Sequence, residues 1–333
     1  MAVILLLATA ASAAPQAVAV DAKIPHYERV SGISGTLSAV GSDTLNNLMT
    51  LWAEGFKKAY PNVRIQIEGK GSSTAPPALI SSTAQLGPMS RVMRSSEIDR
   101  FEERFGYPPT RVNVAIDALA VYVHKDNPID KLMLQQLDAI FSKTRNGGIR
   151  SDITIWGEVG LKGAWARRPI SLYGRNSASG TYGYFKEHAL FGGDYKDTVK
   201  EQPGSASVVQ AVTEDLAGIG YSGIGYRTSG VKTVALARAA GETFYGTDPD
   251  TVHSGHYPLA RFLYVYINKP PQRGTDPLVR EFLTFALSRA GQETVVKAGY
   301  LPLNSRLTKE QLARISQRVA SRGRGKGGGR KAR

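Results

Sequence analysis

Residues 112–124 read VNVAIDALAVYVH, an apolar run much longer than the roughly five to six residues of an ordinary strand. Asp117 interrupts the run near its middle. We interpret the run as a strand that crosses from one lobe of the protein to another, and residues 257–268 as a second extended run that carries the chain back. A length of 333 residues agrees with two lobes, because each lobe is then long enough to bury its own core.

Short β-branched runs alternate with helical patterns on both sides of this stretch, which is typical of an α/β protein with parallel sheets. The clearest predicted helix is residues 46–60, where Leu48, Met49, Trp52 and Phe56 share one face. The predicted strands are 36–40, 63–68, 112–124, 170–173, 218–221 and 262–267, and the further helices are 208–216, 277–287 and 291–298.

The charge of the chain points to an anionic partner: a small anion, a nucleic acid or a membrane surface. The net charge is +14, with 42% hydrophobic and 21% charged residues, as in a globular protein. Six of the excess charges lie between Arg322 and Arg333, which leaves +8 for the rest of the chain. Residues 313–333 are predicted to be a disordered basic tail that either binds polyanions or is a dispensable extension.

The N-terminus predicts export. Residues 2–9 are apolar and the small residues AASAAP follow at 10–15, so residues 1–14 are interpreted as a signal peptide, although its basic start is missing. No later run approaches the roughly 18 to 20 apolar residues of a membrane span. The chain has no cysteine to carry a disulfide or a lipid anchor. We therefore expect an exported protein that is free and soluble.

Three segments combine glycine with hydroxyl side chains at the end of a predicted strand: GSDTL at 41–45, GSST at 71–74 and RNSASGT at 175–181. Where a helix follows such a segment, its first N–H groups lack partners and its dipole end is positive, which suits an oxyanion. Arg175 would supply one full charge and a planar fork of donors. Any single segment is also explained as an ordinary helix cap or turn, but three together favour an anion site.

The order and spacing of several motifs resemble the phosphate-binding proteins of bacterial phosphate transporters, which are class II periplasmic binding proteins. The resemblance covers residues 34–304. It rests on GSDT at 41, GSS at 71, LGPMSR at 86, AIDALAVYVHKDNP at 115, ITIWGEVG at 153, GRNSASGT at 174, GIGY at 218 and GYLPL at 299.

This resemblance implies a two-lobed α/β fold, each lobe a mixed, mostly parallel sheet flanked by helices. Lobe 1 would comprise residues 34–115 and 258–312, lobe 2 residues 116–257, and residues 15–33 would be a linker. The implied function is to capture inorganic phosphate between the lobes and to deliver it, as a monomer, to the membrane permease of an ABC transporter. Closure of the lobes around the anion would be the mechanism.

The resemblance also implies the residues that bind phosphate. They are Thr44, Leu45, Ser72, Ser90, Arg175, Ser179, Gly180 and Thr181. The family has an aspartate where this chain has Ser90, and that aspartate accepts the proton of phosphate and so excludes sulfate. Asp43 or Arg91 is a tentative replacement. A second family aspartate, two residues after the arginine, is Ser177 here.

Other functions stay open at this point. Another oxyanion, such as sulfate or molybdate, would use the same fold. An exported phosphatase is disfavoured, because SASGT is not a G-x-S-x-G motif and no triad partner is identifiable. The five histidines form no metal signature, with only His253 and His256 close together in a predicted loop. We therefore expect no enzymatic activity, no metal and no cofactor.

Overall fold

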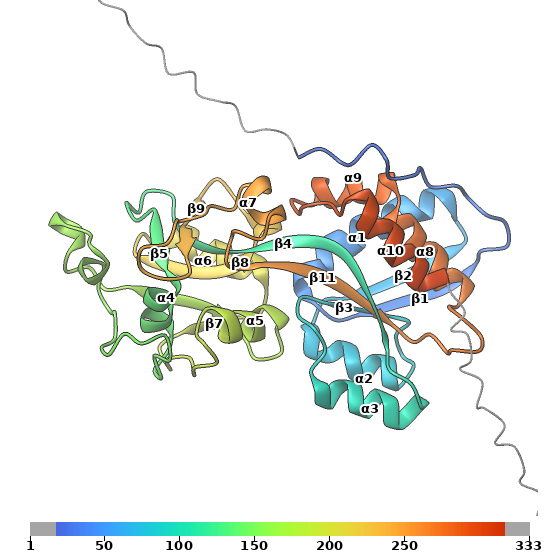
Figure 1. Ribbon diagram of the computed structural model, residues 1–333, viewed down its shortest axis with the longest axis horizontal. Coiled ribbons are helices and arrows are strands. Elements are labelled where there is room, and N and C mark those ends of the chain that lie inside the picture. Colours follow the sequence, from blue (N-terminus) through green and yellow to red (C-terminus); the bar gives the residue numbers. More distant parts are fainter. Residues whose placement is uncertain (1–17, 317–333) are drawn as a thin grey trace, which may run out of the picture.

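The computed structural model describes residues 18–316 and contains two lobes that lie side by side (Figure 1). One path of strands, in the order β2-β1-β3-β11-β4-β8-β6-β7, runs through both lobes. Strand β4 (Thr110–His124) belongs to both: its first part pairs antiparallel with β11 (Ala260–Ile267), and its second part pairs with β8 (Gly218–Gly223). The predicted crossover is therefore one continuous strand of 15 residues.

Lobe 1 is built on parallel strands that the returning strand β11 joins in the antiparallel sense. Helix α1 buries Leu48, Met49, Trp52 and Phe56 against this sheet, as their spacing predicts. The further elements are β1 (Gly35–Val40), β2 (Val63–Glu68), β3 (Leu86–Met89), α1 (Asn46–Ala59), α2 (Ala75–Ile80), α3 (Ser95–Phe105), α8 (Pro277–Leu287), α9 (Arg289–Lys297) and α10 (Ser305–Ser316).

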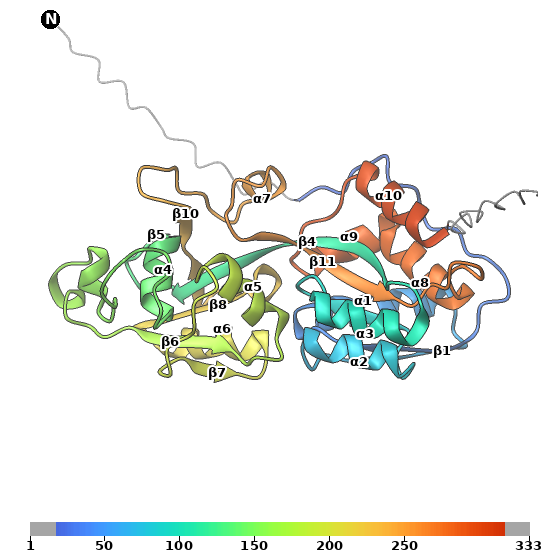
Figure 2. The same cartoon turned by 60° about the horizontal axis from the view of Figure 1, so that its bottom comes forward.

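Lobe 2 has a smaller sheet, in which β6 pairs in parallel with β7 and β8, and a separate pair of strands, β5 and β10 (Figure 2). Tyr221, Phe141 and Phe185 form an aromatic cluster in its core. The further elements are β5 (Lys131–Met133), β6 (Ser171–Arg175), β7 (Lys200–Gln202), β9 (Val231–Thr233), β10 (Ala235–Ala237), α4 (Leu134–Phe141), α5 (Gly180–His188), α6 (Ser205–Glu214) and α7 (Pro249–His253).

The fold class expected from the sequence is confirmed, with local corrections. Residues 18–33, expected as a linker, form no helix or strand but are docked on lobe 1: Ile24 is buried, and the Ser305 N–H donates to the Asp21 carboxylate at 2.9 Å. Helix α10 continues to Ser316, so a tail beginning at residue 313 is wrong because those residues extend the helix. His253 ends α7 instead of lying in a loop.

The described residues do not test every expectation from the sequence. The predicted signal peptide and the cluster from Arg322 to Arg333 lie outside the described residues. The exact lobe boundaries at 115/116 and 257/258 remain a proposal, because β4 runs from one lobe into the other without a break. Within residues 18–316, no helix is long and apolar enough to cross a membrane.

Candidate functional site

The three glycine and hydroxyl segments meet where the two lobes touch. From lobe 1 come Thr44, in a 3-10 turn after β1 (Asp43–Leu45), and Ser72, in a 3-10 turn after β2 (Ser72–Thr74). From lobe 2 comes the loop that opens α5. Thr44 Oγ1 lies 3.0 Å from Thr181 Oγ1, and the Ser73 N–H donates to the Ala178 carbonyl at 3.1 Å. We call this meeting point the interlobe site, made of Thr44, Ser72, Ser90, Arg175, Ser179, Gly180 and Thr181.

Two glycines permit this close approach. A Cβ atom on Gly180 would lie 2.2 Å from Ser72 Oγ and 2.6 Å from Ser90 Oγ. Gly71 has a φ of 111°, and its Cβ would lie 2.5 Å from the Ala178 carbonyl oxygen. Contacts this short are forbidden to a side-chain carbon, so glycine is required at both positions if the lobes are to touch.

The start of α5 is capped by Ser179. Its Oγ accepts hydrogen bonds from the N–H groups of Thr181 at 3.1 Å and Tyr182 at 3.4 Å, so its hydroxyl proton is left to donate elsewhere. The Thr181 N–H is therefore already used, and the Thr181 hydroxyl is the donor that is left for a ligand.

Leu45 is buried at the turn before α1. Its N–H donates to the Ser42 carbonyl at 3.2 Å and closes that turn, so this backbone donor is already used.

Arg175 ends β6 and is 1% exposed. Its Nη1 donates to Ser205 Oγ at 2.7 Å and lies 3.3 Å from the Asp43 carboxylate. Its Nε–H is buried and has no partner among the described residues. Burial lowers the pKa of the guanidinium, and the charge of Asp43 opposes that shift. Arg175 therefore keeps an unused donor. Asp43 supplies the counter-charge that the family places two residues after the arginine, where this chain has Ser177.

Ser90, directly after β3, is fully buried and pairs with Ser72. The Ser90 N–H donates to Ser72 Oγ at 3.0 Å, and the two hydroxyl oxygens are 3.3 Å apart. The Ser72 oxygen therefore acts as an acceptor, and its proton points either to Ser90 or to a ligand. If it points to the ligand, the Ser90 oxygen is free to accept a proton.

The Arg91 guanidinium is held by groups of its own lobe. It makes two hydrogen bonds to the Glu97 carboxylate, at 2.7 and 2.8 Å, and one to Ser73 Oγ at 3.2 Å. Arg91 therefore fixes the loop that carries Ser72. Arg91 cannot replace the family aspartate as a proton acceptor, because a guanidinium only donates hydrogen bonds.

Arg261 and Asp117 were not predicted as site residues, yet they form a buried ion pair between β11 and β4. Arg261 Nη2 lies 2.8 Å from Asp117 Oδ2 and also donates to Thr181 Oγ1 at 2.9 Å, while Nη1 donates to the Ser90 carbonyl at 2.9 Å. The Ile224 N–H donates to the other oxygen of Asp117 at 2.9 Å. Arg261 therefore links both lobes to the crossover strands. The sequence signal was a charged residue inside each long apolar run.

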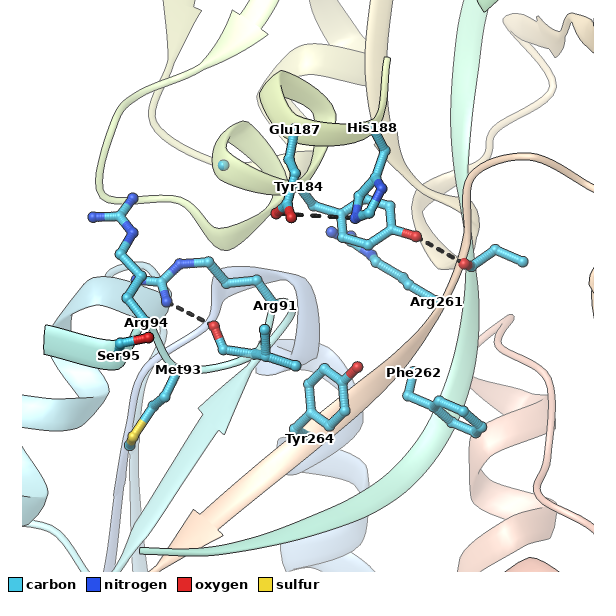
Figure 3. Close-up of a pocket in the computed structure, with 13 residues that line it drawn as sticks. Arg91, Met93, Arg94, Ser95, Tyr184, Glu187, His188, Arg261, Phe262 and Tyr264 are labelled. Carbon is cyan, nitrogen blue, oxygen red and sulfur yellow. Dashed lines mark hydrogen bonds and ion pairs between the residues drawn. The ribbon is translucent and has the colours of Figure 1, made fainter. Parts of the chain in front are cut away.

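A groove of about 720 Å³ lies beside the interlobe site and is lined by both lobes (Figure 3). Arg91 and Arg94 face it from lobe 1, and Tyr184 and His188 from α5. The Tyr184 hydroxyl donates to the Ala260 carbonyl at 2.8 Å, and the His188 ring packs on Tyr184 with centroids 4.1 Å apart. Burial lowers the pKa of His188. The groove therefore lies at the edge of the interface between the two lobes.

Comparison with known proteins identifies the family of this chain. Residues 28–290 match the PBP superfamily domain. A phosphate-binding protein PstS of Pseudomonas aeruginosa is 55% identical over 315 residues, which are 95% of this chain and 98% of that protein. The chain therefore belongs to the PBP superfamily and, within it, to the family of PstS phosphate-binding proteins. The PstS protein of Bacillus subtilis is more distant, at 28% identity over 277 residues.

Solved structures of the family have the same fold. A putative phosphate ABC transporter substrate-binding protein with bound phosphate, from Clostridium perfringens, aligns with a TM-score of 0.69 at 24% identity, covering 81% of this chain and all of that one. A possible phosphate-binding protein from Planctomyces limnophilus aligns with a TM-score of 0.61 at 26% identity, covering 85% and 98%. Both matches agree with the two-lobed architecture.

Proposed function

We propose that this protein captures inorganic phosphate between its lobes and delivers it to the permease of an ABC transporter. The observation that carries the proposal is the buried Nε–H of Arg175, which has no partner among the described residues. The same guanidinium lies 3.3 Å from the carboxylate of Asp43, the residue before Thr44, whose hydroxyl meets that of Thr181 from the other lobe. Buried donors need an acceptor, and a tetrahedral oxyanion is one that all these groups share. The 55% identical relative is a phosphate-binding protein, which supports phosphate as that oxyanion.

The available donors suffice for tight binding. Micromolar affinity corresponds to about 8 kcal/mol, and a hydrogen bond to a charged group contributes roughly 1.5–3 kcal/mol. Arg175 and the hydroxyls of Thr44, Ser72, Ser179 and Thr181 give five such side chains. The N–H of Gly180, the first residue of α5, adds to them, whereas the next two N–H groups already donate to Ser179 Oγ. In this mechanism hydrogen-bond donors and fixed dipoles stabilise the anion, because the charge of Arg175 is already paired with Asp43.

The choice between phosphate and sulfate depends on an acceptor in the site. Sulfate carries no proton at neutral pH, so a site with donors alone would hold it as well as phosphate. The Ser90 oxygen supplies an acceptor when the Ser72 proton points to the ligand. We therefore propose that phosphate is preferred through Ser90, by a smaller margin than a carboxylate would give.

Calorimetric titration of the purified protein with phosphate, arsenate, sulfate and molybdate tests these proposals. Phosphate and arsenate are expected to bind at micromolar concentration or below, and sulfate at least tenfold more weakly. Failure of every oxyanion to bind would refute the site. Turnover of a phosphate ester would instead support an enzyme. The structure gives Ser179 the role of a helix cap and not of a nucleophile, because its Oγ accepts two backbone N–H groups.

We further propose that the protein works as a soluble monomer in the periplasm. The support is the apolar stretch followed by small residues at positions 2–15 and the family itself. Cell fractionation and light scattering test this: the protein is expected in the osmotic-shock fraction at the mass of a single chain. Phosphate-dependent stimulation of the permease ATPase in proteoliposomes would test the partner.

A further inference from the structure

Asp43 belongs to lobe 1, yet its partners belong to lobe 2. One carboxylate oxygen lies 3.3 Å from Arg175 Nη1 and accepts the N–H of Ser205, the first residue of α6, at 2.7 Å. The backbone carbonyl of Asp43 accepts a hydrogen bond from the Tyr226 hydroxyl at 2.8 Å. Three groups of lobe 2 therefore hold this one residue of lobe 1.

The ion pair of Asp43 and Arg175 differs from the other contacts between the lobes. The contacts of Thr44 with Thr181 and of Ser73 with Ala178 join neutral groups. Among the ion pairs of the described residues, Arg91–Glu97 lies within lobe 1, Arg145–Asp152 lies within lobe 2, and Asp117–Arg261 joins the crossover strands. Only the pair of Asp43 and Arg175 spans the facing surfaces of the lobes within the described chain.

The pair makes the environment of Arg175 depend on lobe closure. A guanidinium that is 1% exposed requires a counter-charge, and Ser205 Oγ and the Pro203 carbonyl are neutral partners. When the lobes part, Asp43 leaves with lobe 1, so Arg175 loses its carboxylate and α6 loses an acceptor at its positive end. Closure therefore completes the charge pairing of the arginine.

We propose that Asp43 is an interlobe latch: a positioning residue that stabilises the closed form and orients Arg175 for the anion. The latch rests on the proposed function only for its effect on phosphate affinity. Its effect on the lobes themselves is independent of any ligand. A residue that raises the closed fraction also raises the apparent affinity, because only closed molecules hold the anion.

Dye labelling of the two lobes tests the latch directly. The chain has no cysteine, so K57C on α1 and K162C, at the start of the 3-10 turn Gly163–Trp165, give one exposed label site on each lobe. Energy transfer between the dyes reports closure, and chasing bound phosphate from the labelled protein gives the opening rate. The variants are D43N, which keeps the shape but removes the charge, and D43E, which restores the charge.

The matched control is D152N, because Asp152 pairs with Arg145 and Lys196 within lobe 2. We expect D43N to lower the energy transfer without phosphate, to speed opening about tenfold and to weaken phosphate binding to a similar extent. D43E should recover part of each loss, and D152N should change none. Circular dichroism and the melting temperature show whether each variant is folded.

Three results would overturn the latch: opening and ligand-free energy transfer in D43N equal to wild type, tighter phosphate binding in D43N, or equal changes in D152N. If wild type itself does not bind phosphate, the proposed function fails, and the ligand-free energy transfer alone decides on the latch.

Discussion

Arg261 Nη2 donates a hydrogen bond to Thr181 Oγ1 at 2.9 Å, across the boundary between a crossover strand and lobe 2. A guanidinium has no acceptor, so the Thr181 oxygen must accept. The Thr181 proton is then directed away from Arg261, toward Thr44 or a bound anion. Arg261 therefore sets Thr181 as a donor while Asp117 holds Arg261 in place.

Replacing Thr181 by valine should weaken phosphate binding about tenfold or more, because it removes a directed donor and leaves one Arg261 N–H unpartnered. Calorimetry of T181V measures the loss. The control is T284V, since Thr284 is a half-buried residue of α8 whose hydroxyl bonds to the Arg280 carbonyl, outside the interlobe site. Equal phosphate affinity in T181V and wild type would show that this hydroxyl does not face the anion.

A methyl group at Gly180 should separate binding from folding. In G180A the new Cβ would lie 2.2 Å from Ser72 Oγ, so the lobes cannot close fully, whereas alanine at the first residue of a helix costs little. We expect phosphate binding to fall at least a hundredfold with the melting temperature nearly unchanged. In G183A the nearest side-chain atom, Arg91 Cδ, is at an ordinary 3.5 Å, so binding should be retained.

Installing the family acid at position 90 should sharpen the choice of anion. In S90D a carboxylate beside Ser72 accepts the phosphate proton and repels a fully ionised oxygen. Discrimination against sulfate should therefore rise by about 1–3 kcal/mol. Competition titrations with phosphate and sulfate on S90D and wild type measure the change. The Ser90 hypothesis fails if the ratio of the two affinities stays the same.

The Arg91–Glu97 pair should make stability depend on acid pH. Burial alone would raise the pKa of Glu97, but hydrogen bonds from Arg91 and from the Arg94 N–H outweigh it and hold the pKa below 4.5. A carboxylate with a lowered pKa stabilises the fold above its ordinary pKa, and this contribution disappears as the pH falls through the folded pKa.

Accordingly, E97Q should have a lower melting temperature than wild type at pH 7. The difference between the two melting temperatures should shrink as the pH falls below about 4.5, the ordinary pKa of a glutamate. Melting temperatures from pH 7 down to acid conditions give the profile. E102Q, at an exposed position of the same helix, is the control and should follow wild type. A constant difference between E97Q and wild type at all pH values would contradict this explanation.

Local signals were enough to predict the elements that frame the site. Strand β2 and helix α8 have the predicted bounds, and α1 ends one residue early, because apolar periodicity is strong in each. Strand β3 was missed, since LGPM is short and contains glycine and proline, which strands disfavour. Yet β3 positions Ser90, and its Pro88 carbonyl accepts the Ser42 N–H at 2.8 Å.

The partners within the site were harder to predict than the loops. Glycine and hydroxyl residues before a helix are visible in any local window, so Thr44, Ser72 and Thr181 were named. Arg261 lies 80 residues from Thr181 in the chain, and Ser205 lies 162 from Asp43. Contacts of this kind depend on how the two lobes meet, which no local pattern encodes.

Strand β4 has a thermodynamic consequence for the whole molecule. Because its 15 residues belong to the sheets of both lobes, melting either lobe removes hydrogen bonds from a strand that the other lobe also uses. The lobes should therefore unfold as one cooperative unit, with equal calorimetric and van't Hoff enthalpies, despite their separate cores.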